Sequence, residues 1–116
     1  MTLVKLISFL IIVESGGVDN AIGDNGKAVG CLQIHSIVVE DVNRIYDTDY
    51  QDKDRYDREK SIEIAKLYLQ HYASEERLGR QPTIKDAARI WNGGPDGYRE
   101  KETIQYWIKV KQQIRR

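Results

Sequence analysis

Apolar residues recur along most of this chain at the spacing of helices, and no stretch alternates long enough to predict a large sheet. The first segment, residues 2–14, is apolar around most of its circumference, which predicts a helix at the centre of the core. The pattern rests on Leu3, Leu6, Ile7, Leu10, Ile11 and Val13. Ser15, Gly16 and Gly17 follow, and we expect the helix to stop there because glycine favours the conformation in which helices end.

A loop rich in glycine and aspartate follows this first segment. Its turn-forming residues are Asn20, Gly23, Asp24 and Gly26. They predict an irregular loop over residues 18–30, with room for a very short β-hairpin. Helical spacing resumes at Ala28 or Ser36 and continues to Ile45, and the polar, aspartate-rich segment 47–54 is typical of a surface connection.

Three more helices are predicted in the second half of the chain. Residues 57–77 carry apolar residues at helical spacing, and Gly79 ends this stretch. The sequence Thr-Ile-Lys-Asp at residues 83–86 is a capping box, which opens a helix that ends at residues 93–95, Gly-Gly-Pro. A last helix is expected over residues 100–114, so the predicted fold class is mainly α.

Size and composition limit the classes of protein to which the chain can belong. Its 116 residues, 41% of them hydrophobic, suffice for one core, so we expect a single domain over residues 1–116. Lys plus Arg balance Asp plus Glu at 18 each, which gives no charge-driven attraction to nucleic acid. Cys31 is the only cysteine, and no group of His, Cys and carboxylate residues has metal-ligand spacing. We therefore expect no disulfide, no catalytic metal and no cofactor.

The apolar start of the chain superficially resembles a secretory signal. It lacks a small-residue cleavage site and is too short to cross a bilayer, so we interpret it as a core helix and expect no membrane insertion.

Glu14 stands out because it is the only charged residue between Lys5 and Asp19. It lies where an apolar helix ends, and both the apolar neighbours and the negative end of the helix dipole raise the pKa of a carboxyl group there. Cleavage of a glycosidic bond needs such a protonated acid, because the leaving oxygen must receive a proton. The alternative is a glutamate that only caps the helix or reaches solvent.

Three ordered motifs resemble those of soluble-type lytic transglycosylases. They are Glu14-Ser15, the Gly-Cys-Leu-Gln-Ile sequence at 30–34, and the Ala-Arg-Ile-Trp-Asn-Gly-Gly-Pro sequence at 88–95. Goose-type lysozymes share the first two. The resemblance covers nearly the whole chain, and it implies a lysozyme-like fold whose groove binds peptidoglycan glycan strands and cleaves the β-1,4 bond between MurNAc and GlcNAc.

The resemblance also implies roles for the residues that match these motifs. Glu14 matches the catalytic acid that then serves as base, Gln33 the glutamine that lines the sugar groove, and Asn92 the asparagine near the reacting sugar. Asp24 falls where transglycosylases often carry serine and goose-type lysozymes carry aspartate. Trp91 replaces the usual tyrosine, so we expect the phenolic hydroxyl that could steady the catalytic carboxyl to be missing.

Further residues are candidates for substrate binding. Ser15 belongs to the first motif, and Trp91 and Tyr98 flank the Asn-Gly-Gly-Pro turn, where aromatic rings suit the apolar faces of sugars. Packing in the core is the alternative for Trp91. His35 lies near Gln33 and could bond a carbonyl or lactyl group of the substrate, or else cap or pack.

The reaction itself has two forms. In a transglycosylase the muramic C6 hydroxyl attacks its own anomeric carbon, and Glu14 can accept the proton. An inverting hydrolase instead needs a second carboxylate roughly 6.5 to 9.5 Å from the acid to activate water, and Asp24 is the candidate, with Asp19 behind it. The third motif favours the transglycosylase, and the goose-type-like muramidase is the alternative.

Two other functions stay open, namely a glycan-binding module with impaired catalysis and a helical interaction domain. Action on peptidoglycan implies work in the cell envelope, as a periplasmic or cell-wall enzyme, and we expect a monomer. The sequence leaves the export route open, with delivery by a phage or a conjugation machine and excision from a larger protein as the options.

Overall fold

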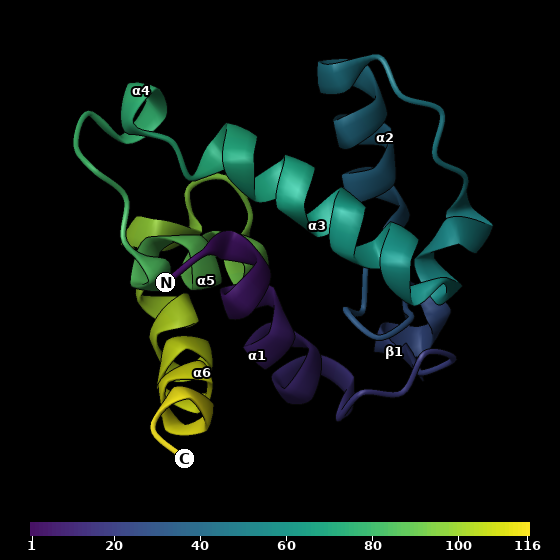
Figure 1. Cartoon of the computed structure of the whole chain (residues 1–116), viewed down its shortest axis with the longest axis horizontal. Coiled ribbons are helices and arrows are strands. Elements are labelled where there is room, and N and C mark those ends of the chain that lie inside the picture. Colours follow the sequence, from purple (N-terminus) through teal and green to yellow (C-terminus); the bar gives the residue numbers. More distant parts are fainter.

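The computed structural model describes residues 1–116 as a set of helices with a small hairpin at one side (Figure 1). The α-helices are α1 (Leu3–Ser15), α2 (Ser36–Tyr46), α3 (Arg58–Tyr72), α4 (Glu75–Leu78), α5 (Ile84–Gly93) and α6 (Ile104–Ile114). Strands β1 (Ile22–Gly23) and β2 (Ala28–Val29) pair antiparallel, with Ile22 opposite Val29. The predictions of a mainly α fold and of a very short hairpin are confirmed.

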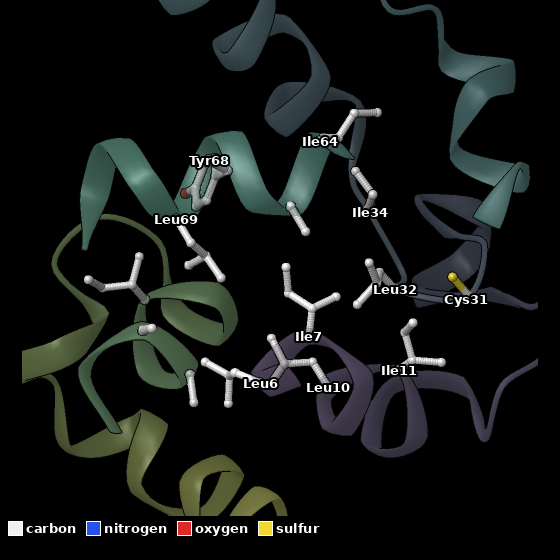
Figure 2. Packing of buried hydrophobic residues seen from close by; sticks show 14 of the residues in the cluster. Leu6, Ile7, Leu10, Ile11, Cys31, Leu32, Ile34, Ile64, Tyr68 and Leu69 are labelled. Atoms are coloured by element: carbon white, nitrogen blue, oxygen red, sulfur yellow. The ribbon is translucent and has the colours of Figure 1, made fainter. Parts of the chain in front are cut away.

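Helix α1 supplies one wall of the hydrophobic core. Figure 2 shows its residues Leu6, Ile7, Leu10 and Ile11 facing side chains of α3 and of the segment that follows the hairpin. The opposite side of α1 is open to solvent, since Val4 and Ile12 are 50% and 47% exposed. The expectation of a helix buried around most of its circumference is therefore wrong, because its helical partners α3, α5 and α6 leave one face uncovered.

The long helix predicted over residues 57–77 is divided in two. Helix α3 ends at Tyr72, and Ser74 adopts an extended conformation in which its side chain accepts a hydrogen bond from the backbone N–H of Arg77. Serine is a preferred N-cap, and here it begins α4 only two residues after α3 ends. Gly79 ends α4 in the left-handed conformation, as the sequence predicts.

The last helix begins later than predicted, at Ile104. Residues 97–103 form two short 3₁₀ turns, η3 (Gly97–Arg99) and η4 (Lys101–Thr103). The buried Thr103 hydroxyl holds them in place, because it accepts a hydrogen bond from Arg89 Nε at 2.8 Å and lies 2.7 Å from the carbonyl oxygen of Gly97.

The predicted capping box fixes the start of α5. The Thr83 side chain accepts from the backbone N–H of Asp86, and the Asp86 carboxylate accepts from the backbone N–H of Thr83. The Arg80 guanidinium adds two hydrogen bonds of 2.7 and 2.9 Å to this carboxylate and holds the pKa of Asp86 at about 2. This anchored helix carries Trp91 and Asn92 at its other end.

Gly30 lets the chain leave the hairpin close to a neighbouring segment. Its φ is +86°, and a β-carbon there would overlap the backbone carbonyl of Arg55. That carbonyl accepts a hydrogen bond from the buried Ser61 hydroxyl, and the Arg55 side chain donates in turn to the carbonyl of Ile34 at 2.9 Å. The segment between β2 and α2 is therefore bonded to the start of α3, which holds Gln33 and His35 in place.

Candidate active site

Glu14 lies in the last turn of α1, half-buried, at one wall of a cavity of about 300 Å³. We call this space the Glu14 cavity. It is lined by Glu14, Asp24, Ala28, Gln33, Ile34, His35, Val38, Trp91 and Asn92. The lining comes from the end of α1, from the hairpin through the start of α2, and from the last turns of α5. Six of the eight predicted site residues thus meet in one place, and Ser15 and Tyr98 lie outside the lining.

The electrostatic setting of Glu14 favours the protonated carboxyl group. Burial raises the pKa of Glu14 above its ordinary value. A hydrogen bond from Tyr106, the nearby Trp91 indole and the charge of Lys109 act in the opposite direction and are outweighed. The direction matches the prediction from the apolar sequence around position 14.

Tyr106 of α6 supplies the phenol that the sequence analysis expected to be missing. Its hydroxyl donates a 2.8 Å hydrogen bond to Glu14 Oε2. Burial, together with the neighbouring carboxylate of Glu14, raises the pKa of Tyr106 well above its ordinary value, so the phenol remains a donor. The expectation drawn from Trp91 is therefore wrong, because the hydroxyl arrives from a different helix.

The Ser15 hydroxyl is hydrogen-bonded to the backbone around it. It lies 2.8 Å from the carbonyl oxygen of Cys31 and accepts hydrogen bonds of 3.1 Å from the backbone N–H groups of Gly17 and Val18. With these bonds made, the hydroxyl has little capacity left for a substrate. Its position supports a structural role instead of the predicted substrate contact. The hydroxyl fastens the end of α1 to the segment that follows the hairpin.

Gln33 lines the cavity, but its amide nitrogen is hydrogen-bonded within the protein. Its backbone is left-handed, with φ of +51°, and its Nε2 donates to the carbonyl oxygens of Ala21 at 3.2 Å and Gly30 at 3.0 Å. Gly23 leaves the space that Oε1 fills, since a β-carbon there would overlap it. Both Nε2 protons are committed, so Oε1 is the group that a substrate donor could reach.

The two aromatic candidates occupy different surroundings. Trp91 both lines the cavity and packs edge-on against Tyr68, with ring centroids 5.7 Å apart, so its ring belongs to the cavity wall and to the aromatic packing behind it. Tyr98 lies in η3, where the guanidinium groups of Arg77 and Arg99 each sit 5.8 Å from its ring centroid. The structure does not bring Tyr98 to Glu14.

The side chains of Asp24 and His35 contact each other on the wall provided by the hairpin. His35 Nε2 lies 3.2 Å from Asp24 Oδ2, and the two side chains are 43% and 58% exposed, respectively. The cavity therefore contains a second carboxylate besides Glu14, and this carboxylate already has a partner.

Comparison with protein families decides what kind of protein carries this cavity. The family model described as the Transglycosylase SLT domain matches residues 1–113. The chain belongs to this family. Members of the SLT family are lytic transglycosylases, so this SLT domain is an enzyme of the lytic transglycosylase or lysozyme-like kind, with peptidoglycan as its substrate and the cell envelope as its place of action.

Other comparisons and the helix lengths add little to the SLT assignment. A comparison with curated proteins found no match to the chain. None of the helices of the SLT domain combines the length and apolar character needed to cross a bilayer.

Tyr106 is the residue of this SLT domain that sequence reasoning missed. It lies one helical turn before Val110 and three residues after Thr103, both of which are buried, so it belongs to the inward face of α6. A tyrosine on such a face needs a polar partner for its hydroxyl, and this was the available signal. The identity of the partner, 92 residues earlier in the chain, had no signal in the local pattern.

Proposed function

We propose that this SLT domain cleaves the β-1,4 bond between MurNAc and GlcNAc in peptidoglycan by nonhydrolytic transglycosylation, with Glu14 as acid and then base. The observation that carries the proposal is the setting of Glu14, which is half-buried at a cavity, has a raised pKa and accepts a hydrogen bond from Tyr106. A carboxyl group whose protonated form is favoured in this way can give a proton to a leaving oxygen, and general acids contribute roughly 10²- to 10⁴-fold to rates.

The proposed reaction conserves every atom of the glycan strand. The bond from C1 of MurNAc to the bridging oxygen breaks, and the Glu14 proton passes to that oxygen. The C6 hydroxyl then attacks C1, and its proton passes to the Glu14 carboxylate, which restores the enzyme and leaves a 1,6-anhydro end. Between the two transfers Glu14 is ionised, and the Tyr106 hydroxyl donates to it in that state.

The remaining lining residues fit a sugar polymer. The Trp91 ring offers an apolar face, and the Asn92 amide and Gln33 Oε1 offer hydrogen bonds. Asp24 lies in the same cavity, and this observation favours the goose-type-like muramidase as the second candidate, in which Asp24 would position water.

Digestion of purified sacculi with the whole chain tests this proposal. Mass spectrometry of the soluble fragments is expected to show mainly 1,6-anhydromuramic ends. Fragments that carry only reducing ends would establish the muramidase instead. Glycan that is bound but uncut would identify a binding module and contradict the proposal.

Tyr106→Phe tests the role of the phenol. The Tyr106 hydroxyl stabilises the ionised form of Glu14, so its removal is expected to raise the pKa of Glu14 further. The alkaline limb of the pH–activity profile, where the acid loses its proton, should then move to higher pH. Activity at the optimum should fall about tenfold, the effect of one charge-assisted hydrogen bond.

The profile is measured by the clearing of sacculus suspensions over a series of buffers. Tyr98→Phe is the matched control, because Tyr98 loses the same hydroxyl outside the Glu14 cavity. An alkaline limb that stays in place in Tyr106→Phe would contradict the assignment.

A further inference from the structure

The Asp24–His35 pair joins two elements across the wall of the Glu14 cavity. Asp24 begins η1 (Asp24–Gly26), the turn between β1 and β2, with a φ of +50°. His35 is the N-cap residue of α2, yet its side chain makes no capping bond to that helix. Its Nε2 contacts the Asp24 carboxylate instead. The imidazole therefore does not cap α2, and it contacts the carboxylate of Asp24 instead.

The charged groups around this pair are few. Asp24 and Glu14 are the two carboxylates that line the Glu14 cavity, and His35 is the one residue there that can become cationic. On its other sides His35 borders two neighbouring hollows, one with Lys27 and Arg55 and one with Asp41. Asp41 is already bonded to Arg44 and Tyr72, and Arg55 to backbone carbonyls. Among the groups that line the Glu14 cavity, His35 is thus the one in contact with Asp24.

A carboxylate oxygen that already accepts a hydrogen bond has less capacity left to accept a proton from water. In the hydrolytic branch of the reaction, water adds to C1 of MurNAc, its proton passes to a carboxylate, and a reducing end forms. In the transglycosylation branch the C6 oxygen adds to C1, and its proton passes to Glu14. The two branches therefore differ in whether Asp24 is available as a base.

We propose that His35 is a specificity-determining positioning residue, which holds the Asp24 carboxylate and thereby keeps the SLT domain from hydrolysing its substrate. This inference rests on the proposed function and adds to it what selects the product. The contact holds the Asp24 carboxylate against the imidazole, so removal of the imidazole should raise the share of reducing ends.

The test measures the ratio of reducing to 1,6-anhydro ends released from sacculi. His35→Ala is expected to raise this ratio about tenfold. His35→Gln, which keeps a hydrogen-bond donor at this position, should give an intermediate ratio. Adding Asp24→Asn to His35→Ala should return the ratio to the low value of the natural protein.

A matched control separates this effect from loosening of the loop. Asp19 pairs with Arg58 at 2.8 Å, with an exposure of 51%, and it lies in the same loop outside the Glu14 cavity. Asp19→Asn breaks this surface ion pair and should leave the product ratio unchanged.

Each outcome bears on a different claim. A ratio in His35→Ala within twofold of the natural one, with cleavage retained, would overturn this inference alone. A high ratio that persists in the double variant would also overturn it, since the base would then not be Asp24. Absence of both kinds of end from the natural digest would overturn the proposed function and this inference with it.

Discussion

Glu14→Gln is expected to lower the rate of sacculus cleavage by about 10³-fold or more, in either branch of the reaction, while the fold is retained. The amide keeps the shape of the side chain and can accept the hydrogen bond from Tyr106, but it has no proton to give to the leaving oxygen. The rate is measured from soluble muropeptides. Glu40→Gln, on the exposed side of α2, is the matched control and should cleave normally. Activity retained in Glu14→Gln would remove Glu14 from its role.

The same variant should be more stable than the natural protein at neutral pH. Burial raises the pKa of Glu14 in the folded state, so folding opposes its ionisation. The natural protein is therefore relatively most stable below the ordinary glutamate pKa, and it loses stability as pH rises from there through the raised pKa. Melting temperatures of both proteins across this range give the comparison. A variant that is less stable throughout would show that the fold favours the ionised carboxylate.

Gly30→Ala is expected to destabilise the fold by about 3 kcal/mol or more, the largest structural effect that we predict. An alanine there adopts a left-handed φ, at roughly 1–2 kcal/mol, and its β-carbon also overlaps the carbonyl of Arg55. Because this carbonyl is held by Ser61, neither backbone can move without loss of hydrogen bonds. Urea denaturation followed by circular dichroism measures the change.

Gly79→Ala provides the control for this prediction. Gly79 has a similar φ of +75°, and no atom beyond Gly79 and its two chain neighbours lies within 4 Å of the place of its β-carbon. It should therefore lose only the conformational part, about 1 kcal/mol. Equal losses in the two variants would show that the overlap with Arg55 is relieved at little cost.

The sequence predicts this fold best where the signals are local. The capping box at Thr83 places the start of α5, and the glycines after Ser15 place the end of α1, because both depend on residues within one or two turns. The break at Ser74 was missed since apolar spacing continues through it. The open face of α1 was also missed, because Val4 and Ile12 are as apolar as its buried residues.

The residues of the candidate site also divide into those that belong to local motifs and those whose place depends on distant contacts. Glu14, Gln33 and Asn92 were predicted from short motifs, and the fold places all three at one cavity. Ser15 belongs to a motif too, but its hydroxyl is used by the backbone. Tyr106 and the Asp24–His35 pair depend on contacts between distant or irregular segments, which periodicity does not encode.

The hydrogen bonds of Ser15 also affect how much of the glycan's binding free energy is spent on arranging the cavity. They join the helix end that carries Glu14 to the carbonyl of Cys31, two residues before Gln33. These two walls of the cavity are thus parts of one hydrogen-bonded unit, and their spacing is set when the protein folds. An incoming strand does not have to draw these walls together, so more of its binding free energy remains for aligning the muramic ring with the acid.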